Sequence, residues 1–274
     1  MKRKIISIIQ VLLVLVLVWS GYNIYSYHKD NQAYKVIDND YKAMRDKSIK
    51  NNKEQSNKEE VDPEIESAIL FVQELNKSYP QIKGRLLIEN LDMDYPIVQG
   101  EDNSFYLNHD YKGNYHPFGA VFMDSRNSLD LSDQNTIIYG HNVKSGHVFN
   151  PLNKYRDEKY VEDNPYVVID SLDNRFVYEI FAVYDADQYE DYRSVSYDEK
   201  DFEELISRVR EKNFIDKKLP NADDKILTLS TCSDVNDRMV VQAKLVKTEK
   251  WYRKTANWPF FYMDWFVRLI GFFW

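Results

Sequence analysis

The chain has 274 residues, enough to bury the core of one substantial domain. Its 44 acidic residues outnumber its 36 Lys and Arg, and the resulting net charge of -8 argues against a nucleic-acid-binding protein, which usually presents a basic face. The single cysteine excludes a disulfide within the chain and a zinc site built from several cysteines. Aromatic residues make up 15% of the chain, which suits a β-rich fold.

Residues 1–28 predict a membrane anchor. A basic cluster at positions 2–4 precedes an apolar run from residue 5 to about residue 25, and about 20 apolar residues cross the hydrocarbon core of a bilayer. A cleaved signal peptide is the alternative, but its apolar region is normally shorter and ends at a small-residue site. Trp19 and several tyrosines follow here instead, as in an interfacial belt. Because basic residues flank the cytoplasmic side, we expect a cytoplasmic N-terminus and an extracellular remainder.

Residues 29–61 are polar and charged, and Ile49 is the only aliphatic residue between positions 48 and 60. Such a segment has too little apolar surface to form a core. We therefore predict a polar stalk, transiently helical, between the anchor and a domain that begins at residue 62. An exposed helix that belongs to the domain is the alternative.

Two helices are predicted beyond this segment. Asp62 is a suitable cap, Pro63 suits the first helical position, and Pro80 ends the first helix. Ser196 and Glu199 have the spacing of a capping box for the second helix. Both helices carry an apolar stripe, which we interpret as core packing: Ile65, Ala68, Ile69, Val72 and Leu75 in the first, and Phe202, Leu205, Ile206 and Val209 in the second.

Short apolar runs bounded by turn residues predict strands in the rest of the domain. They lie at residues 85–88, 95–98, 120–123, 136–139, 166–169, 176–184, 226–229 and 239–246. About eight strands in a domain of this size indicate a β-barrel or a β-sandwich.

Residues 249–274 form an aromatic C-terminal tail that includes Asp264 and Arg268. Charges at the centre of a bilayer are costly, and the run is short for a span. We therefore predict a helix lying in the membrane interface in contact with lipid. A second span, or packing against the domain or a partner, are the alternatives.

Cys232 ends an apolar run and precedes a polar loop, which places it near the rim of a sheet. A lone cysteine is either a small buried residue or a reactive thiol, and its position alone favours the inert interpretation. A reactive thiol needs a partner, because its ordinary pKa is about 8.5.

Two residues are candidate partners for this thiol. Among the five histidines, His141 also lies at a junction between a strand and a loop. Arg238 opens the last strand six residues after Cys232, close enough to hold a thiolate or a developing oxyanion. An ordinary surface arginine paired with Asp234 or Asp237 is the alternative.

These residues carry a resemblance to the sortase family. Residues 228–232 (Thr-Leu-Ser-Thr-Cys) followed by 238–241 (Arg-Met-Val-Val) resemble the family's Cys and Arg signature, and residues 139–142 (Tyr-Gly-His-Asn) resemble its histidine motif. Further similar pieces follow the family's order, at Gly84 and at residues 94–100, 103–107 and 119–124. The helices near 62–77 and 198–212 are similar to those that mark class B sortases.

The resemblance covers roughly residues 62–247 and implies an eight-stranded β-barrel within a catalytic domain at 62–248. It implies catalytic roles for Cys232, His141 and Arg238, and substrate contacts for Ser230 and, near the same motifs, Thr231 and Asn142. No metal and no cofactor are expected.

The implied activity is cell-wall transpeptidation. Cys232 would cleave a sorting motif near the C-terminus of surface proteins through a thioester and pass the acyl group to an amine of a peptidoglycan precursor or a pilin. A cysteine hydrolase acting on cell-wall peptides and a non-catalytic binding module are the alternatives. The sorting motif itself, and a role in haem uptake or pilus attachment, are not readable from the sequence.

Overall fold

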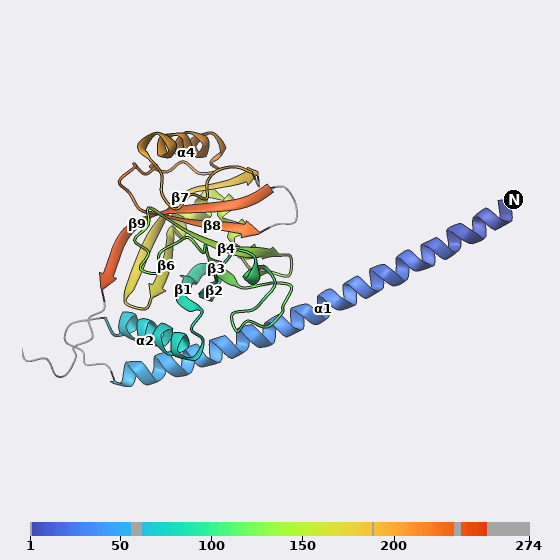
Figure 1. Cartoon of the computed structure of the whole chain (residues 1–274), viewed down its shortest axis with the longest axis horizontal. Coiled ribbons are helices and arrows are strands. Elements are labelled where there is room, and N and C mark those ends of the chain that lie inside the picture. Colours follow the sequence, from blue (N-terminus) through green and yellow to red (C-terminus); the bar gives the residue numbers. More distant parts are fainter. Residues whose placement is uncertain (1, 56–61, 188, 233–236, 251–274) are drawn as a thin grey trace, which may run out of the picture.

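The computed structural model describes residues 2–55, 62–187, 189–232 and 237–250, which form a β-barrel flanked by helices (Figure 1). Its strands are β1 (Ile82–Ile88), β2 (Met93–Gln99), β3 (Val121–Met123), β4 (Asn135–Val143), β5 (His147–Val148), β6 (Tyr166–Ser171), β7 (Asn174–Asp187), β8 (Ile226–Cys232) and β9 (Asp237–Lys250). Seven of the eight predicted runs lie within one of these strands, and the run at 120–123 begins one residue before β3.

Eight of the strands close into a ring. They are hydrogen-bonded in the order β3-β2-β1-β6-β7-β9-β8-β4, and a β3–β4 pairing completes the circle. The two-residue strand β5 pairs with the far end of β4, beyond the residues that pair with β3. The predicted eight-stranded barrel is therefore confirmed, and the β4–β8 pair is parallel.

Strand β8 shows how the barrel wall has two faces. Leu227 and Leu229 belong to the large interior cluster, whereas Ile226 packs on the outside with residues of helix α4 (Glu199–Lys212). Successive side chains of a strand point to opposite faces, so even-numbered positions of β8 lie on the outer face. Helix α4 covers part of that face (Figure 1).

Helices α2 (Pro63–Ser78) and α4 (Glu199–Lys212) confirm the two helix predictions. The Asp62 carboxylate accepts a hydrogen bond from the Glu64 amide at 2.8 Å, as expected for a cap. The predicted cap at Ser196 is wrong, because Asp198 stands directly before α4 and accepts from the Asp201 amide at 2.8 Å. The remaining short helices are η1 (Glu89–Leu91), η2 (Phe105–Leu107), η3 (Asn150–Arg156) and α3 (Glu158–Asp163).

Helix α1 (Lys2–Gln55) is continuous for 54 residues and extends far beyond the barrel (Figure 1). Its first half exposes the apolar side chains that the sequence assigns to the anchor. Among the described residues it is the one helix that is long and apolar enough to cross a membrane, with a mean hydropathy of 2.3 in its most apolar part. It is therefore a candidate membrane span by length and composition.

The second half of α1 packs on the barrel, contrary to the predicted stalk. Tyr34 and Tyr41 are buried there. The Tyr41 hydroxyl donates to Asp94 Oδ1 at 3.0 Å, and Arg45 Nη1 lies 2.6 Å from Asp94 Oδ2. Tyr34, Tyr41 and Ser48 recur every seven residues, so they form one buried stripe on a helix whose other faces are polar.

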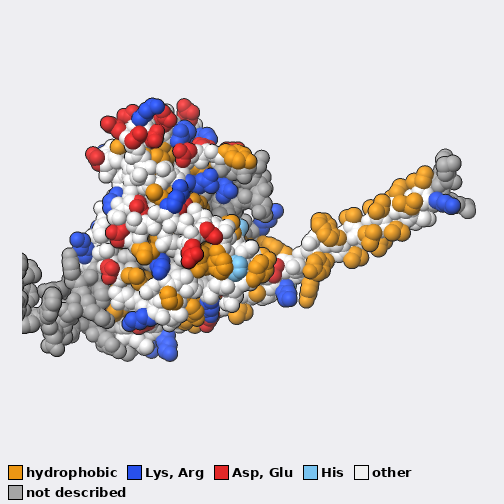
Figure 2. Space-filling model, viewed as in Figure 1, with side chains coloured by type: hydrophobic (Ala, Val, Ile, Leu, Met, Phe, Trp, Pro, Cys, Tyr) orange, Lys and Arg blue, Asp and Glu red, His pale blue; other side chains and the backbone are white. Residues whose placement is uncertain are grey.

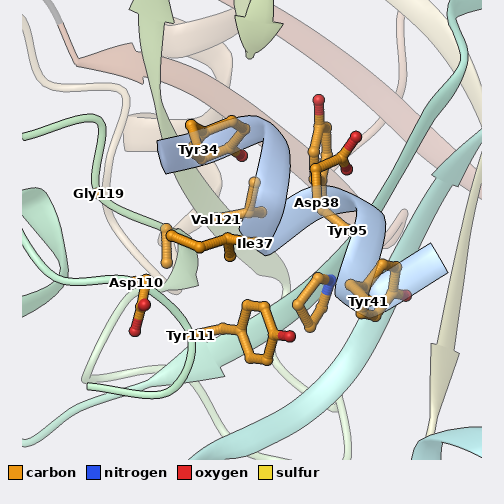
Figure 3. Close-up of a pocket in the computed structure, with 11 residues that line it drawn as sticks. Tyr34, Ile37, Asp38, Tyr41, Tyr95, Asp110, Tyr111, Gly119 and Val121 are labelled. Carbon is orange, nitrogen blue, oxygen red and sulfur yellow. The ribbon is translucent and has the colours of Figure 1, made fainter. Parts of the chain in front are cut away.

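The contact between α1 and the barrel is close. In Figure 3 the Tyr34, Ile37 and Tyr41 side chains extend from α1 toward β2, β3 and the loop at Tyr111. The cavity between them has a volume of about 20 Å³, room for roughly one water molecule. The folded unit therefore includes the docked part of α1, and its boundary does not fall at residue 62. The predicted interfacial helix at 249–274 lies outside the described residues from position 251 onward.

Candidate active site

Three neighbouring strands bring together the residues singled out in the sequence. In the parallel pair β4–β8, His141 lies directly opposite Cys232. In the antiparallel pair β8–β9, Ser230 lies opposite Val240. Continuing that register by two residues places Arg238 across from Cys232. Residues far apart in the sequence thus meet at one end of the barrel, because both parallel strands end at the same edge.

Positions 141 and 238 share one face of the barrel wall. Even-numbered positions of β8 lie outside, and Tyr139 of β4 and Val240 of β9 also belong to clusters outside the main interior core. Since side chains alternate along a strand, positions 141 and 238 continue this outer face. In the backbone register, Cys232 lies between these two positions at the rim.

His141 is oriented by a backbone carbonyl. Its Nε2 lies 2.7 Å from the carbonyl oxygen of Leu107, which is the last residue of η2. A carbonyl only accepts hydrogen bonds, so Nε2 carries the proton. The Nδ1 atom is then the nitrogen that can exchange a proton with a reactant.

Two glycines shape the surroundings of His141. A Cβ at Gly140 would lie 2.7 Å from the ring of Phe149, whose amide donates to the His141 carbonyl at 2.9 Å. Gly119 has a φ of +60°, and a Cβ there would collide with the Tyr106 carbonyl and lie 2.7 Å from that of Leu107. Both positions require glycine for the histidine and its partner to lie where they do.

Arg238 has an unused hydrogen-bond donor. Its side chain is half-buried, and its buried Nε has no hydrogen-bond partner among the residues that the structure describes. A buried donor without a partner costs about 1–3 kcal/mol, so an acceptor supplied by a bound molecule would be stabilised there. The side chains of Asp234 and Asp237, the partners considered in the alternative, lie outside the described part.

The three predicted substrate-contact residues differ in how far their side chains are buried. Ser230 is fully buried and its Oγ lies 2.9 Å from the Tyr192 hydroxyl. Thr231 is also buried, and its Oγ1 accepts from the Met239 amide at 2.9 Å. Asn142 is exposed, and its Oδ1 accepts from Asn150 Nδ2 at 2.6 Å. Asn142 is thus the member of this set that a bound molecule can contact without rearrangement.

A buried carboxylate supports β4 beneath the site. Asp124 accepts from the Tyr139 hydroxyl at 2.8 Å and from Arg126 Nε and Nη2 at 2.9 and 2.8 Å. Burial alone would raise the pKa of Asp124, but the hydrogen bonds from Arg126 and Tyr139 outweigh it and hold that pKa below its ordinary value. The ionised carboxylate fixes the strand that ends in His141.

Sequence reasoning missed several of these supports. The Leu107 carbonyl is a backbone group, so no residue type signals it. Tyr192 lies in a polar stretch between β7 and α4, and Asp124 was noted only as part of a similar motif. Among the described residues, no group of three His, Cys, Asp or Glu side chains has the arrangement of a metal site.

This geometry is suited to acyl transfer: a thiol position, a histidine with one nitrogen for proton exchange, and an arginine donor that is unpaired within the described part of the chain lie on adjacent strands. Comparison with known proteins supports the same type of reaction. Residues 86–246 match the family model described as a sortase domain. Sortase B of Listeria monocytogenes is 35% identical over 237 residues, which cover 84% of this chain and 92% of that protein.

Two solved structures have similar folds. The Staphylococcus aureus sortase B-substrate complex is 28% identical with a TM-score of 0.62, covering 66% of this chain and 86% of that one. A sortase B complexed with triglycine is 25% identical with a TM-score of 0.68, covering 78% and 98%. The barrel, the family model and the relatives agree, and the chain belongs to the sortase family as a class B sortase, a cysteine transpeptidase of cell-wall sorting.

Proposed function

We propose that this sortase is a membrane-anchored enzyme that cleaves a sorting motif in surface proteins through a thioester on Cys232 and transfers the acyl group to an amine of the cell wall or of a pilus. The observation that carries the proposal is the backbone register across β4, β8 and β9: His141 pairs with Cys232, and the β8–β9 register, continued by two residues, supports Arg238 as its other neighbour. Each residue type matches one requirement of acyl transfer: nucleophile, proton carrier and oxyanion donor.

In the first step, the Cys232 thiolate attacks the carbonyl carbon of the scissile peptide bond. The carbonyl oxygen becomes an oxyanion, and the guanidinium of Arg238 donates hydrogen bonds to it. His141 delivers a proton from Nδ1 to the leaving nitrogen, the C–N bond breaks, and a thioester remains on Cys232. The bond from Nε2 to the Leu107 carbonyl keeps the ring in the orientation for this transfer.

In the second step, an amine attacks the thioester carbonyl. His141, now neutral at Nδ1, removes a proton from the attacking nitrogen, and the thiolate of Cys232 leaves as the new amide forms. The sortase B complexed with triglycine supports an amine-bearing acceptor, and the S. aureus substrate complex supports a protein substrate with a sorting motif. A peptidoglycan precursor or a pilin would supply the amine.

For substrate contacts, we assign different roles to the three candidates. Asn142 is exposed beside His141 and would contact the bound peptide directly. Ser230 and Thr231 are buried, so they would shape the wall beneath the peptide. The Tyr192 hydroxyl bonded to Ser230 would hold that wall in place.

The proposal includes membrane attachment with a cytoplasmic N-terminus. The exposed apolar half of α1 supports the span, and the basic residues at positions 2–4 support the orientation. The aromatic segment after residue 250 would add a second contact with lipid at the outer surface.

The test is product analysis by mass spectrometry with the full chain in detergent. A panel of sorting peptides would be incubated with and without an amine acceptor, using the parent chain, Cys232→Ala and the matched control Lys200→Ala on α4. We expect the amide product only with acceptor, no cleavage by Cys232→Ala, and unchanged activity for the control. Cleavage by Cys232→Ala would refute the scheme. An identical carboxylic acid product with and without acceptor would indicate a hydrolase.

A further inference from the structure

The apolar and docked halves of α1 follow each other without a linker. About 20 residues cross the hydrocarbon core, so a span that starts at residue 5 leaves it near residue 25. The first contacts with the barrel come immediately afterwards. The Tyr27 and Phe118 rings lie 5.7 Å apart, and His116 Nε2 donates to the Asp30 carbonyl at 3.1 Å.

These positions set the depth of the barrel relative to the bilayer. A helix rises about 1.5 Å per residue, so Asp30 lies only about 8 Å beyond the end of the hydrocarbon core. The headgroup layer on each side is itself about 5–8 Å thick. His116 and Phe118 therefore lie at the level of the headgroups when α1 crosses the membrane.

The docked half of α1 prevents the barrel from moving away from that level. Tyr34 packs between His116 and His147, with ring centroids 5.5 and 5.0 Å away. Further along the helix, Asp40 forms an ion pair with Lys112. The contact of Tyr34 with His116 and the ion pair of Asp40 with Lys112 together hold the segment from Phe105 to Phe118 against α1.

This segment exposes aromatic side chains to solvent. Tyr115 is 72% exposed and Phe105 is 43% exposed. The Phe105 ring stacks on His109 at 3.9 Å, and His109 meets Tyr115 edge-on at 6.0 Å, so the three rings form one continuous group. Hydrophobic side chains gather where α1 leaves the barrel (Figure 2). Exposed tyrosines on an interfacial surface are stabilised by the mixed polarity of the headgroup region.

We propose that the exposed rings of Phe105 and Tyr115, carried by the parts of this segment that hydrogen-bond next to His116, form a membrane-contact surface that enters the headgroup region of the bilayer. The inference rests on the proposed anchoring through α1 and adds to it a second, folded contact. The same segment carries Leu107, whose carbonyl orients His141. The catalytic histidine therefore lies one hydrogen bond away from a surface that touches lipid.

The test uses the full chain reconstituted in phosphatidylcholine vesicles. In a Cys232→Ala background, Tyr115→Cys would carry an environment-sensitive fluorophore. Lys200→Cys would be the matched control, because Lys200 belongs to α4, which lies on the side of the barrel away from α1 (Figure 1). A spin label on the lipid headgroup serves as quencher. Adding Tyr34→Ala, which loosens the docked helix, provides a second comparison.

We expect loss of most of the fluorescence at position 115 and little at position 200, with a blue-shifted emission at 115 only. Tyr34→Ala should reduce the quenching at 115. Equal quenching at both positions, in a chain that resists extraction by alkaline carbonate, would overturn the membrane-contact surface while leaving the anchor intact. Extraction of the chain by carbonate would instead show that the anchoring fails, and the inference would fall with it.

Discussion

Replacing Tyr41 tests whether α1 belongs to the folded domain. Its ring is buried against Phe71 and Tyr111 at 5.7 and 6.0 Å, and its hydroxyl donates to Asp94. Truncating a buried aromatic side chain costs about 3–5 kcal/mol, so Tyr41→Ala should lower Tm by about 6–20 °C for a domain of this size. Tyr41→Phe removes only the hydrogen bond to a charged acceptor and should cost about 1.5–3 kcal/mol.

The assay is thermal unfolding of the full chain in detergent, followed by circular dichroism and by limited proteolysis. Val36→Ala is the matched control, because Val36 is 68% exposed on the same part of α1, and surface substitutions stay within about 0.5 kcal/mol. If Tyr41→Ala leaves both Tm and the protease resistance of residues 29–55 equal to those of Val36→Ala, α1 is not docked in solution and the reasoning is refuted.

Four further predictions follow from the site and its surroundings. Arg238→Lys should lower kcat by about 10²–10³-fold in the transpeptidation assay, because an ammonium does not reproduce the planar donor pair; an unchanged kcat would remove Arg238 from the mechanism. Gly119→Ala should reduce activity and Tm more than Gly113→Ala, since both have positive φ but only Gly119 lacks space for a Cβ; equal effects would contradict the role of the Gly119 loop. Burial lowers the pKa of His116 below its ordinary 6.5, so near this pH the unfolded chain binds more protons than the folded chain. Tm should therefore fall as the pH is lowered from about 7.5 to about 5.5, and the fall should be smaller in His116→Gln. In a chain lacking the anchor at residues 1–28, deleting residues 251–274 should weaken partitioning into liposomes, and unchanged partitioning would rule out the interfacial tail.

The barrel could be predicted because its strands carry strong local signals. Runs such as 136–139 and 226–229 are apolar on both faces, since one face meets the interior and the other meets α2 or α4. The closure into a ring was not readable from those runs. It depends on the β3–β4 pairing, which involves only two residue pairs.

The docked half of α1 was hidden by its composition. Its surface is largely polar, and its most buried contacts come from two tyrosines and a serine, with Ile37, Met44 and Ile49 only partly buried beside them. The key ionic contact joins Arg45 to Asp94, which is itself held by Arg85 Nε at 2.7 Å. A carboxylate buried between two arginines from distant parts of the chain has no local sequence signature.

The candidate site was partly predictable for the same reason that the strands were. Cys232 and His141 each follow a strong apolar run, so their positions at strand ends were visible, whereas their adjacency depended on the parallel pairing of β4 with β8. The resemblance to the sortase family, which implies catalytic roles for both residues, was what predicted that Cys232 and His141 lie next to each other. The burial of Ser230 and Thr231 depends on tertiary packing, which the local sequence does not reveal. Because they are buried, we propose that they shape the wall beneath a bound peptide instead of contacting the peptide directly.

Under the proposed anchoring, the unbroken helix α1 would also determine where the enzyme can search for its substrates. A flexible tether of about 30 residues would let a domain wander roughly 30 Å from its anchor. With the proposed anchoring, a docked helix would remove that freedom, so the catalytic centre would travel at a fixed height above the lipid and turn around its anchor only as the helix rotates and diffuses. Encounters would then be confined to a thin layer parallel to the bilayer, and a protein would become a substrate only when it displays its sorting motif within that layer.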